Sequence, residues 1–69
     1  MHAYPLSDDE HHLLQLMFGG LSDEQIANRL YVSVRTMRRQ LRNLMENAGA
    51  VNRFTLGAIA AHQRWIDPS

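Results

Sequence analysis

Apolar residues recur at helical spacing in four stretches of this chain, and each stretch has signals that start or stop a helix. The first stretch follows Ser7, has Glu10 three residues later and stops at Gly19-Gly20. A serine N-cap with a glutamate at its third helical position favours a helix start, and glycines favour its end. The pattern predicts a first helix over about residues 7–18.

The same start signal repeats at Ser22, which has a glutamine three residues later. A narrow apolar face then predicts a short second helix over about residues 23–30. Residues 31–33 form a tight connection, and a longer apolar stripe predicts a third helix over residues 34–48, ended by Gly49. A short helix, a three-residue turn and a longer helix have the layout of a helix-turn-helix.

Asn52 and the apolar residues after it predict a fourth helix over about residues 52–65. Gly57 inside it costs ~1 kcal/mol relative to alanine unless the position needs close packing. No strand pattern is found, and 69 residues provide one core. The sequence therefore predicts a single all-α domain over residues 1–69, with four helices and a helix-turn-helix formed by the second and third.

Composition excludes several classes of protein. The chain has no cysteine, an apolar fraction of 45% and no apolar run near the ~20 residues that a bilayer span needs. The first residues lack the features of a signal peptide, so we expect a cytoplasmic protein without a membrane partner. We see no nucleophile–base pair and no phosphate-binding glycine loop. The sequence predicts no enzymatic activity and no cofactor.

Histidines could suggest a metal site, but their spacing argues against one. His11 and His12 are adjacent on the first predicted helix and would point about 100° apart. Two such side chains cannot hold the same ion, so we expect no metal ligands. Asp8, Asp9 and Glu10 match the positive end of a helix, which is the ordinary role of acids there.

Charges are sorted along the chain although the formal net charge is zero. Residues 1–24 hold five acidic residues and no arginine or lysine, whereas residues 25–45 hold five arginines and no acid. All seven basic residues are arginines, whose planar fork suits bidentate contact with phosphate or guanine. A coding sequence rich in G and C would give the same bias, so residue choice alone does not decide the partner.

The third predicted helix carries two stripes. Given ~3.6 residues per turn, an arginine stripe lies about 120° round the helix from an apolar stripe. Cations near the start of a helix oppose its dipole, so these arginines break a rule that the first two helices obey. Such a conflict is typical of a functional site, because bound phosphates would make the arginines favourable. The arginines are Arg35, Arg38, Arg39 and Arg42, and the apolar residues are Val34, Met37, Leu41, Leu44 and Ala48.

Two interpretations of the arginine stripe remain at this point. It is either a DNA-binding surface or a solvated basic face that pairs with acids of the first helix or of another molecule. The helix-turn-helix layout favours duplex DNA. The rival is a protein-interaction module whose basic helix docks an acidic partner such as RNA polymerase.

The ordered set of residues resembles the LuxR/GerE-type (FixJ/NarL-type) DNA-binding domain of bacterial transcriptional regulators. The resemblance covers about residues 6–66. Sigma-factor region 4 shares the pattern through the third helix, but Gly49, Asn52-Arg53 and a fourth helix favour LuxR/GerE. The motifs that carry the resemblance are Leu6-Ser7, Glu10, Leu13-Leu14, Gly20-Leu21-Ser22, Ile26-Ala27, Leu30, Val32-Ser33, Thr36-Met37-Arg38, Leu41, Gly49 and Asn52-Arg53.

The resemblance implies a sequence-specific transcriptional regulator whose recognition helix, residues 34–48, enters the major groove. It also implies a homodimer through the fourth helix, where Gly57, Ala58 and Ala61 would permit close approach. Leu56 and Gly57 depart from the family pattern at this point. Base-reading positions would be Arg38, Arg39 and Arg42, and nearby phosphate or groove contacts would be Arg35, Thr36, Ser33, Gln40 and Ser22.

Overall fold

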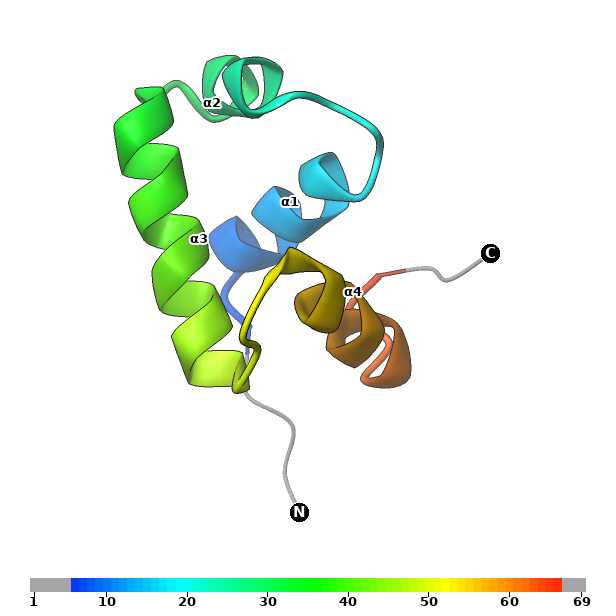
Figure 1. Ribbon diagram of the computed structural model, residues 1–69. Helices are drawn as coiled ribbons and strands as arrows, with labels where there is room; N and C mark the ends of the chain where they lie inside the picture. Colours follow the sequence, from blue (N-terminus) through cyan, green and yellow to red (C-terminus); the bar gives the residue numbers. More distant parts are fainter. Residues whose placement is uncertain (1–5, 67–69) are drawn as a thin grey trace.

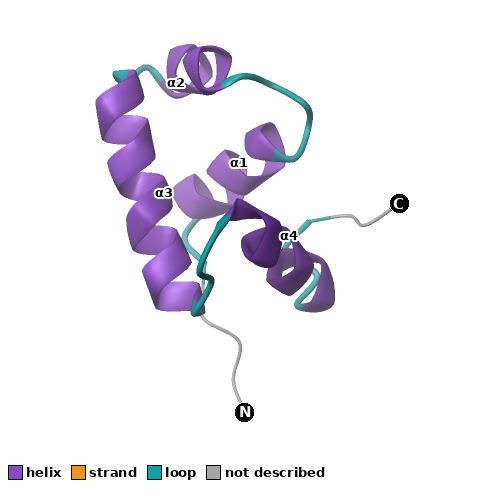
Figure 2. Ribbon diagram, in the orientation of Figure 1, coloured by secondary structure: helices purple, strands orange, loops and turns teal. Residues whose placement is uncertain are grey.

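Four helices form the fold of the computed structural model, which describes residues 6–66. Every regular element in this range is an α-helix, as predicted (Figures 1 and 2). Helix α1 lies in the middle, α3 runs along one side of it, α2 crosses near the start of α3, and α4 lies across from α3 (Figure 1). The helices are α1 (Asp8–Met17), α2 (Asp23–Leu30), α3 (Val34–Ala48) and α4 (Arg53–His62).

The prediction for the fourth helix was wrong at its C-terminal end, which lies at His62 and not near residue 65. Arg64 has a left-handed backbone (φ 61°), and the Trp65 amide donates to the Ala60 carbonyl at 2.8 Å. This is a helix-ending turn that usually contains glycine. It directs Trp65 and Ile66 back onto the core, so their apolar character reflects packing after the helix and not its continuation.

Smaller differences arise because capping residues flank the helices. Ser7 caps α1 and Phe18 follows its last residue, so α1 is one residue shorter at each end than the predicted 7–18. Asn52 is likewise the N-cap of α4, where its side chain accepts from the Thr55 amide at 2.7 Å. Ser7 and Asn52 thus cap their helices and are not helical themselves. The bounds of α2 and α3 are as predicted.

A core contributed by all four helices holds the fold together. Helices α2 and α3 pack most extensively against each other, which fixes the helix-turn-helix as a unit. Burial of a leucine or methionine side chain contributes about 1.5–3 kcal/mol, so the leucines, Ile26 and Met37 are the main source of stability. The buried residues are Leu13, Leu14, Ile26, Ala27, Met37, Leu41, Leu44, Leu56 and Ala60.

Gly57 has a packing reason that only the structure shows. A Cβ added there would come within 3.0 Å of Phe18 Cε1. The ring at the end of α1 therefore lies directly against the α4 backbone, which explains a glycine inside a helix. The missing side chain of Gly57 therefore allows α1 and α4 to pack within the domain.

The turn between α2 and α3 places the two helices. Tyr31 has a left-handed backbone (φ 59°) and is 95% exposed. The Val32 amide donates to the Ala27 carbonyl at 3.0 Å, which closes the end of α2 before Ser33 starts α3. The connection is therefore as short as predicted and leaves the first turn of α3 at the surface.

No helix in the described range combines the length and apolar character needed to cross a membrane.

Candidate nucleic-acid interface

The first turn of α3 is organised by Ser33. Its Oγ accepts from the Thr36 amide at 3.1 Å and donates to Thr36 Oγ1 at 3.0 Å. Unlike α1 and α2, α3 has no glutamate or glutamine completing a capping box, and its first turn holds no acid. The start of α3 therefore keeps the positive end of its dipole without an internal anion.

Three of the predicted arginines surround one hollow in the surface. Arg35, Arg39, Arg42 and Thr36 line a concavity of about 360 Å³ on α3. None of these arginines is paired with an acid within residues 6–66. Three guanidinium groups and a hydroxyl around a hollow have the chemistry to donate hydrogen bonds to a phosphate or to the polar edge of a base.

Arg38 lies at the edge of this surface and has a different environment. Its Nε donates to Asp23 Oδ2 at 3.0 Å, and its side chain remains 60% exposed. Asp23 begins α2, so the contact ties the start of α2 to the second turn of α3. The predicted arginine stripe of α3 is thus divided into two neighbouring parts, the hollow and the tied Arg38.

Asp23 also binds Arg53 at the start of α4. Arg53 Nη1 donates to Asp23 Oδ1 and Nη2 donates to Oδ2, both at 2.9 Å. Bidentate arginine–carboxylate pairs are the strongest and most geometrically defined of such contacts. One carboxylate therefore accepts three hydrogen bonds and connects α2, α3 and α4.

These contacts lower the pKa of Asp23 from 3.8 to about 2. The hydrogen bonds from Arg53 have the largest effect, burial partly opposes them, and the hydrogen bond from Arg38 lowers the pKa further. The Asp23 carboxylate in turn raises the pKa of Arg53 by accepting its hydrogen bonds. The carboxylate is consequently charged at every pH above about 4.

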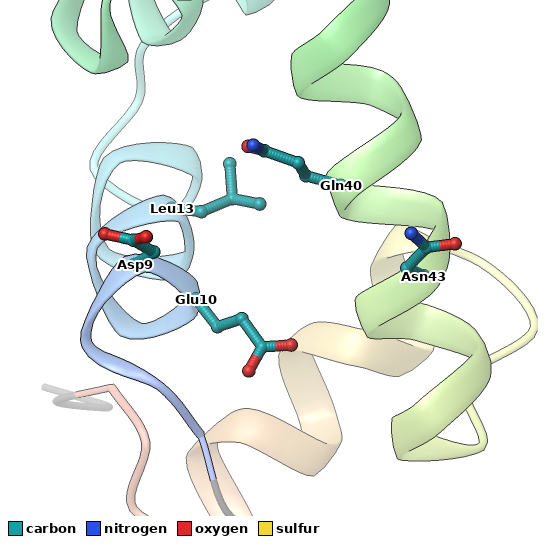
Figure 3. A pocket seen from close by; sticks show the side chains of 5 residues that line it. All are labelled: Asp9, Glu10, Leu13, Gln40 and Asn43. Carbon is teal, nitrogen blue, oxygen red and sulfur yellow. The ribbon is translucent and has the colours of Figure 1, made fainter.

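Gln40 is separated from the arginines. It lies with Asn43 on the side of α3 that faces α1, where both line a pocket of about 220 Å³ with Asp9, Glu10 and Leu13 (Figure 3). The rotation of about 100° per residue places Gln40 beyond Arg39 and toward the core side of the helix. The structure therefore does not bring Gln40 together with Arg35, Arg38 and Arg42.

Ser22 and Ser33 have comparable roles at helix starts. Ser22 Oγ accepts from the Gln25 amide at 3.2 Å, and Gln25 Oε1 accepts from the Ser22 amide at 2.9 Å. Both serines are exposed, so each hydroxyl lies at the positive end of a helix and at the surface. Such positions suit contact with a phosphate oxygen.

Sequence reasoning missed two residues at this surface, Asp23 and Arg53. The sequence shows Asp23 only as one of the five acids of residues 1–24, and Arg53 only as part of a motif. One signal was available, because Arg53 opposes the dipole at the start of α4 just as Arg35 does in α3. Its partner could not be identified, since Asp23 lies 30 residues earlier in the chain.

No histidine among residues 6–66 lines the arginine hollow. His11 and His12 are exposed on α1, and His2 lies outside the described residues. Among residues 6–66 there is no group of three or more histidine, cysteine or acidic side chains that could hold a metal ion.

Comparison with known proteins identifies the family. Residues 4–60, which include α1 to α3 and most of α4, match the GerE family of bacterial regulatory proteins, also described as the luxR family. The chain belongs to the LuxR family. The match selects LuxR/GerE over the sigma-factor alternative because it continues past the third helix. This LuxR-family chain is a DNA-binding helix-turn-helix domain of the kind found in transcriptional regulators.

Two relatives illustrate the size of the regulators in which such LuxR-family domains occur. The chain is 42% identical over 64 residues to the bialaphos biosynthetic pathway regulatory protein of Streptomyces hygroscopicus, matching 93% of this chain and 25% of that protein. It is 39% identical over 49 residues to the HTH-type transcriptional regulator MalT of Yersinia pestis (strain Pestoides F), matching 71% of this chain and 5% of MalT. The chain thus spans a quarter or less of these relatives. No solved structure matches it.

Proposed function

We propose that α3 is a recognition helix that enters the major groove of duplex DNA and reads a specific sequence. The observation that carries this proposal is that four arginines of α3 are exposed, three of them in its first two turns near the positive end, while Met37 and Leu41 are buried. A helix dipole and guanidinium groups both attract phosphates, and arginine is the commonest side chain that reads guanine. The domain needs no catalytic group for this function.

The individual roles that we propose are those that the LuxR/GerE resemblance implies. Arg38, Arg39 and Arg42 read base edges, and Arg35, Thr36 and Ser33 contact phosphates next to the hollow. Ser22 contacts a phosphate from the start of α2. Gln40 contacts the groove only from the side, because it lines the pocket that faces α1 (Figure 3).

Fluorescence anisotropy on a random-sequence duplex at about 50 and 200 mM salt tests DNA binding. We expect affinity to fall steeply with salt, since each neutralised phosphate adds about 0.9 to the log–log slope. The double variant Arg38→Ala/Arg42→Ala should bind far more weakly. The matched control Arg29→Ala/Arg64→Ala removes the same charge from two exposed arginines outside α3 and should bind nearly as the unmodified chain does.

A second experiment tests sequence reading. Selection from a random duplex library should return a defined site for the unmodified chain. Absence of any selected site would contradict specific recognition. If the chain ignores duplex DNA at low salt but binds an acidic protein such as a subunit of RNA polymerase, the arginine surface serves a protein partner.

The start of α4 supports a second proposal, a homodimer on DNA. Val51 and Phe54 are 86% and 87% exposed, and Ala58 is exposed one turn after Phe54. Large apolar side chains this exposed favour an interface. Gly57 cannot contribute as expected from the sequence, because Phe18 lies against it. Val51, Phe54 and Ala58 are therefore the contacts that we propose between two copies.

Analytical ultracentrifugation on an inverted repeat of the selected site tests the homodimer. The unmodified chain should form a complex of two chains per duplex, and Phe54→Asp should favour one. Tyr31→Asn is the control, since Tyr31 is also an exposed aromatic residue but lies between α2 and α3. A one-to-one complex of the unmodified chain would remove the dimer from the proposal.

A transcriptional regulator of this kind acts in the cytoplasm, where its DNA is.

A further inference from the structure

Arg38 differs from the other arginines of α3 in one respect, which is its contact with Asp23. The hydrogen bond joins Nε to Asp23 Oδ2 at 3.0 Å, and Asp23 is itself held by two hydrogen bonds from Arg53 at 2.9 Å. The Asp23 side chain is 19% exposed, whereas Arg38 and Arg53 are 60% and 46% exposed. A well-anchored acceptor thus holds the Nε of a long, exposed side chain.

The atoms used in this contact matter for DNA. Binding through Nε does not occupy Nη1 and Nη2, which form the end of the arginine fork. Bidentate reading of guanine O6 and N7 needs that fork in one orientation. A carboxylate on Nε restricts the rotation of the guanidinium plane, so the outward end of Arg38 is oriented before DNA arrives.

The charges also favour this role. Asp23 alone would repel phosphates and would cancel the charge of Arg38. Arg53 supplies a second positive charge to the same carboxylate, so the three side chains together keep one net positive charge. Arg53 therefore lets Asp23 orient Arg38 without removing the attraction of this corner for DNA.

We propose that Asp23, anchored by Arg53, is a positioning residue for DNA recognition that pre-orients Arg38 for reading a base pair. The inference rests on the proposed function of α3. Ordering a long side chain in advance removes part of the entropic cost of binding, about two- to tenfold in affinity. The benefit is restricted to the cognate site, because non-specific binding uses the charge of Arg38 and not its orientation.

Asp23→Asn tests the proposal against a matched control, Asp8→Asn. Both acids are the first residue of a helix with a serine cap, and both changes remove one negative charge. Asp8 makes no ion pair within residues 6–66, whereas Asp23 binds Arg38 and Arg53. Anisotropy is measured on the duplex selected by the unmodified chain and on a random-sequence duplex.

The expected result is a fall of about two- to tenfold in the ratio of selected-site to random-duplex affinity for Asp23→Asn only. The selected base preference should weaken at the position that Arg38→Ala also affects. In the Arg38→Ala background, Asp23→Asn should change the ratio no more than Asp8→Asn does. Equal ratios for the two asparagine variants, or independent effects of Asp23→Asn and Arg38→Ala, would overturn the positioning role.

A measurement on the unmodified chain covers the case in which Asp23→Asn folds poorly. Nitrogen-15 relaxation of the arginine Nε groups should show greater order for Arg38 than for Arg35, Arg39 and Arg42. Equal mobility of the four would overturn the proposal. If the unmodified chain selects no DNA sequence at all, the proposed function of α3 fails, and this outcome is distinct from loss of the positioning role alone.

Discussion

Helices α2 and α3 both begin at a serine cap, yet their first turns have opposite charges. Ser22 and Gln25 form a complete capping box in α2, and Asp23 and Glu24 match the helix dipole. Helix α3 has the Ser33 cap without the reciprocal contact, no acid in its first turn and Arg35 at the second position. The comparison shows that α2 is built for local stability, whereas α3 gives up part of it at the surface where an anion would bind.

Substitution of the reading arginines should have the largest effect, and that effect should be on DNA binding. Arg38→Ala and Arg42→Ala should each lose ~1–3 kcal/mol of binding free energy on the selected duplex and relax the preference at one base pair. Anisotropy and repeated site selection measure both. Thermal unfolding should change little. Unchanged base preference in either variant would remove that arginine from base reading.

Loss of the serine N-cap should lower the stability of the chain in α2 and in α1 alike. Ser22→Ala should lower the free energy of unfolding by ~1 kcal/mol, because the Gln25 amide loses its acceptor. Ser7→Ala in α1 removes an equivalent cap and is the matched control, with a similar loss in denaturant unfolding. If Ser22 contacts a phosphate, only Ser22→Ala should also weaken DNA binding. Equal DNA affinities of the two variants would leave Ser22 with the cap role alone.

Lowering the pH should show how much the Asp23 contacts with Arg38 and Arg53 contribute to stability. The pKa of Asp23 is lowered from 3.8 to about 2 in the folded chain, so its contribution is present above pH 3.8 and is lost as the pH falls toward about 2. The partner arginines are partly exposed, and we expect about 1 kcal/mol after screening by solvent. Denaturant unfolding between pH 5 and about pH 2 measures this loss. Asp23→Asn should reduce the slope of stability against pH, and an unchanged slope would contradict the assignment to Asp23.

An acid in the first turn of α3, as in α2, should change stability by the smallest amount. It should also separate the effect of this turn on stability from its effect on DNA binding. Arg35→Glu should raise the free energy of unfolding by ~0.3–1 kcal/mol through the helix dipole, while DNA binding falls. Arg35→Gln removes the charge without adding an acid and should give an intermediate result. Thermal unfolding and anisotropy of the same samples measure both quantities. A loss of stability in Arg35→Glu would show that α3 does not sacrifice stability at this position.

Part of this molecule could be predicted because its signals are local. Serine or asparagine caps interact with an amide three residues later, so the starts of all four helices follow from short stretches of sequence. Helical periodicity likewise separates the arginine stripe of α3 from the buried Met37, Leu41 and Leu44. The end of α4 was predicted wrongly, because Trp65 and Ile66 continue the apolar pattern while Arg64 has already ended the helix.

Local signals in the sequence account for the four helix starts, the short turn before α3 and the clustering of arginines toward the positive end of α3. The differences between these arginines depend on how the helices pack. Packing of α2 and α4 brings Asp23 to Arg38 and Arg53, which lie 15 and 30 residues away, and turns Gln40 toward α1. Caps and periodicity act over three or four residues, whereas an ion pair between helices depends on how their buried faces pack together.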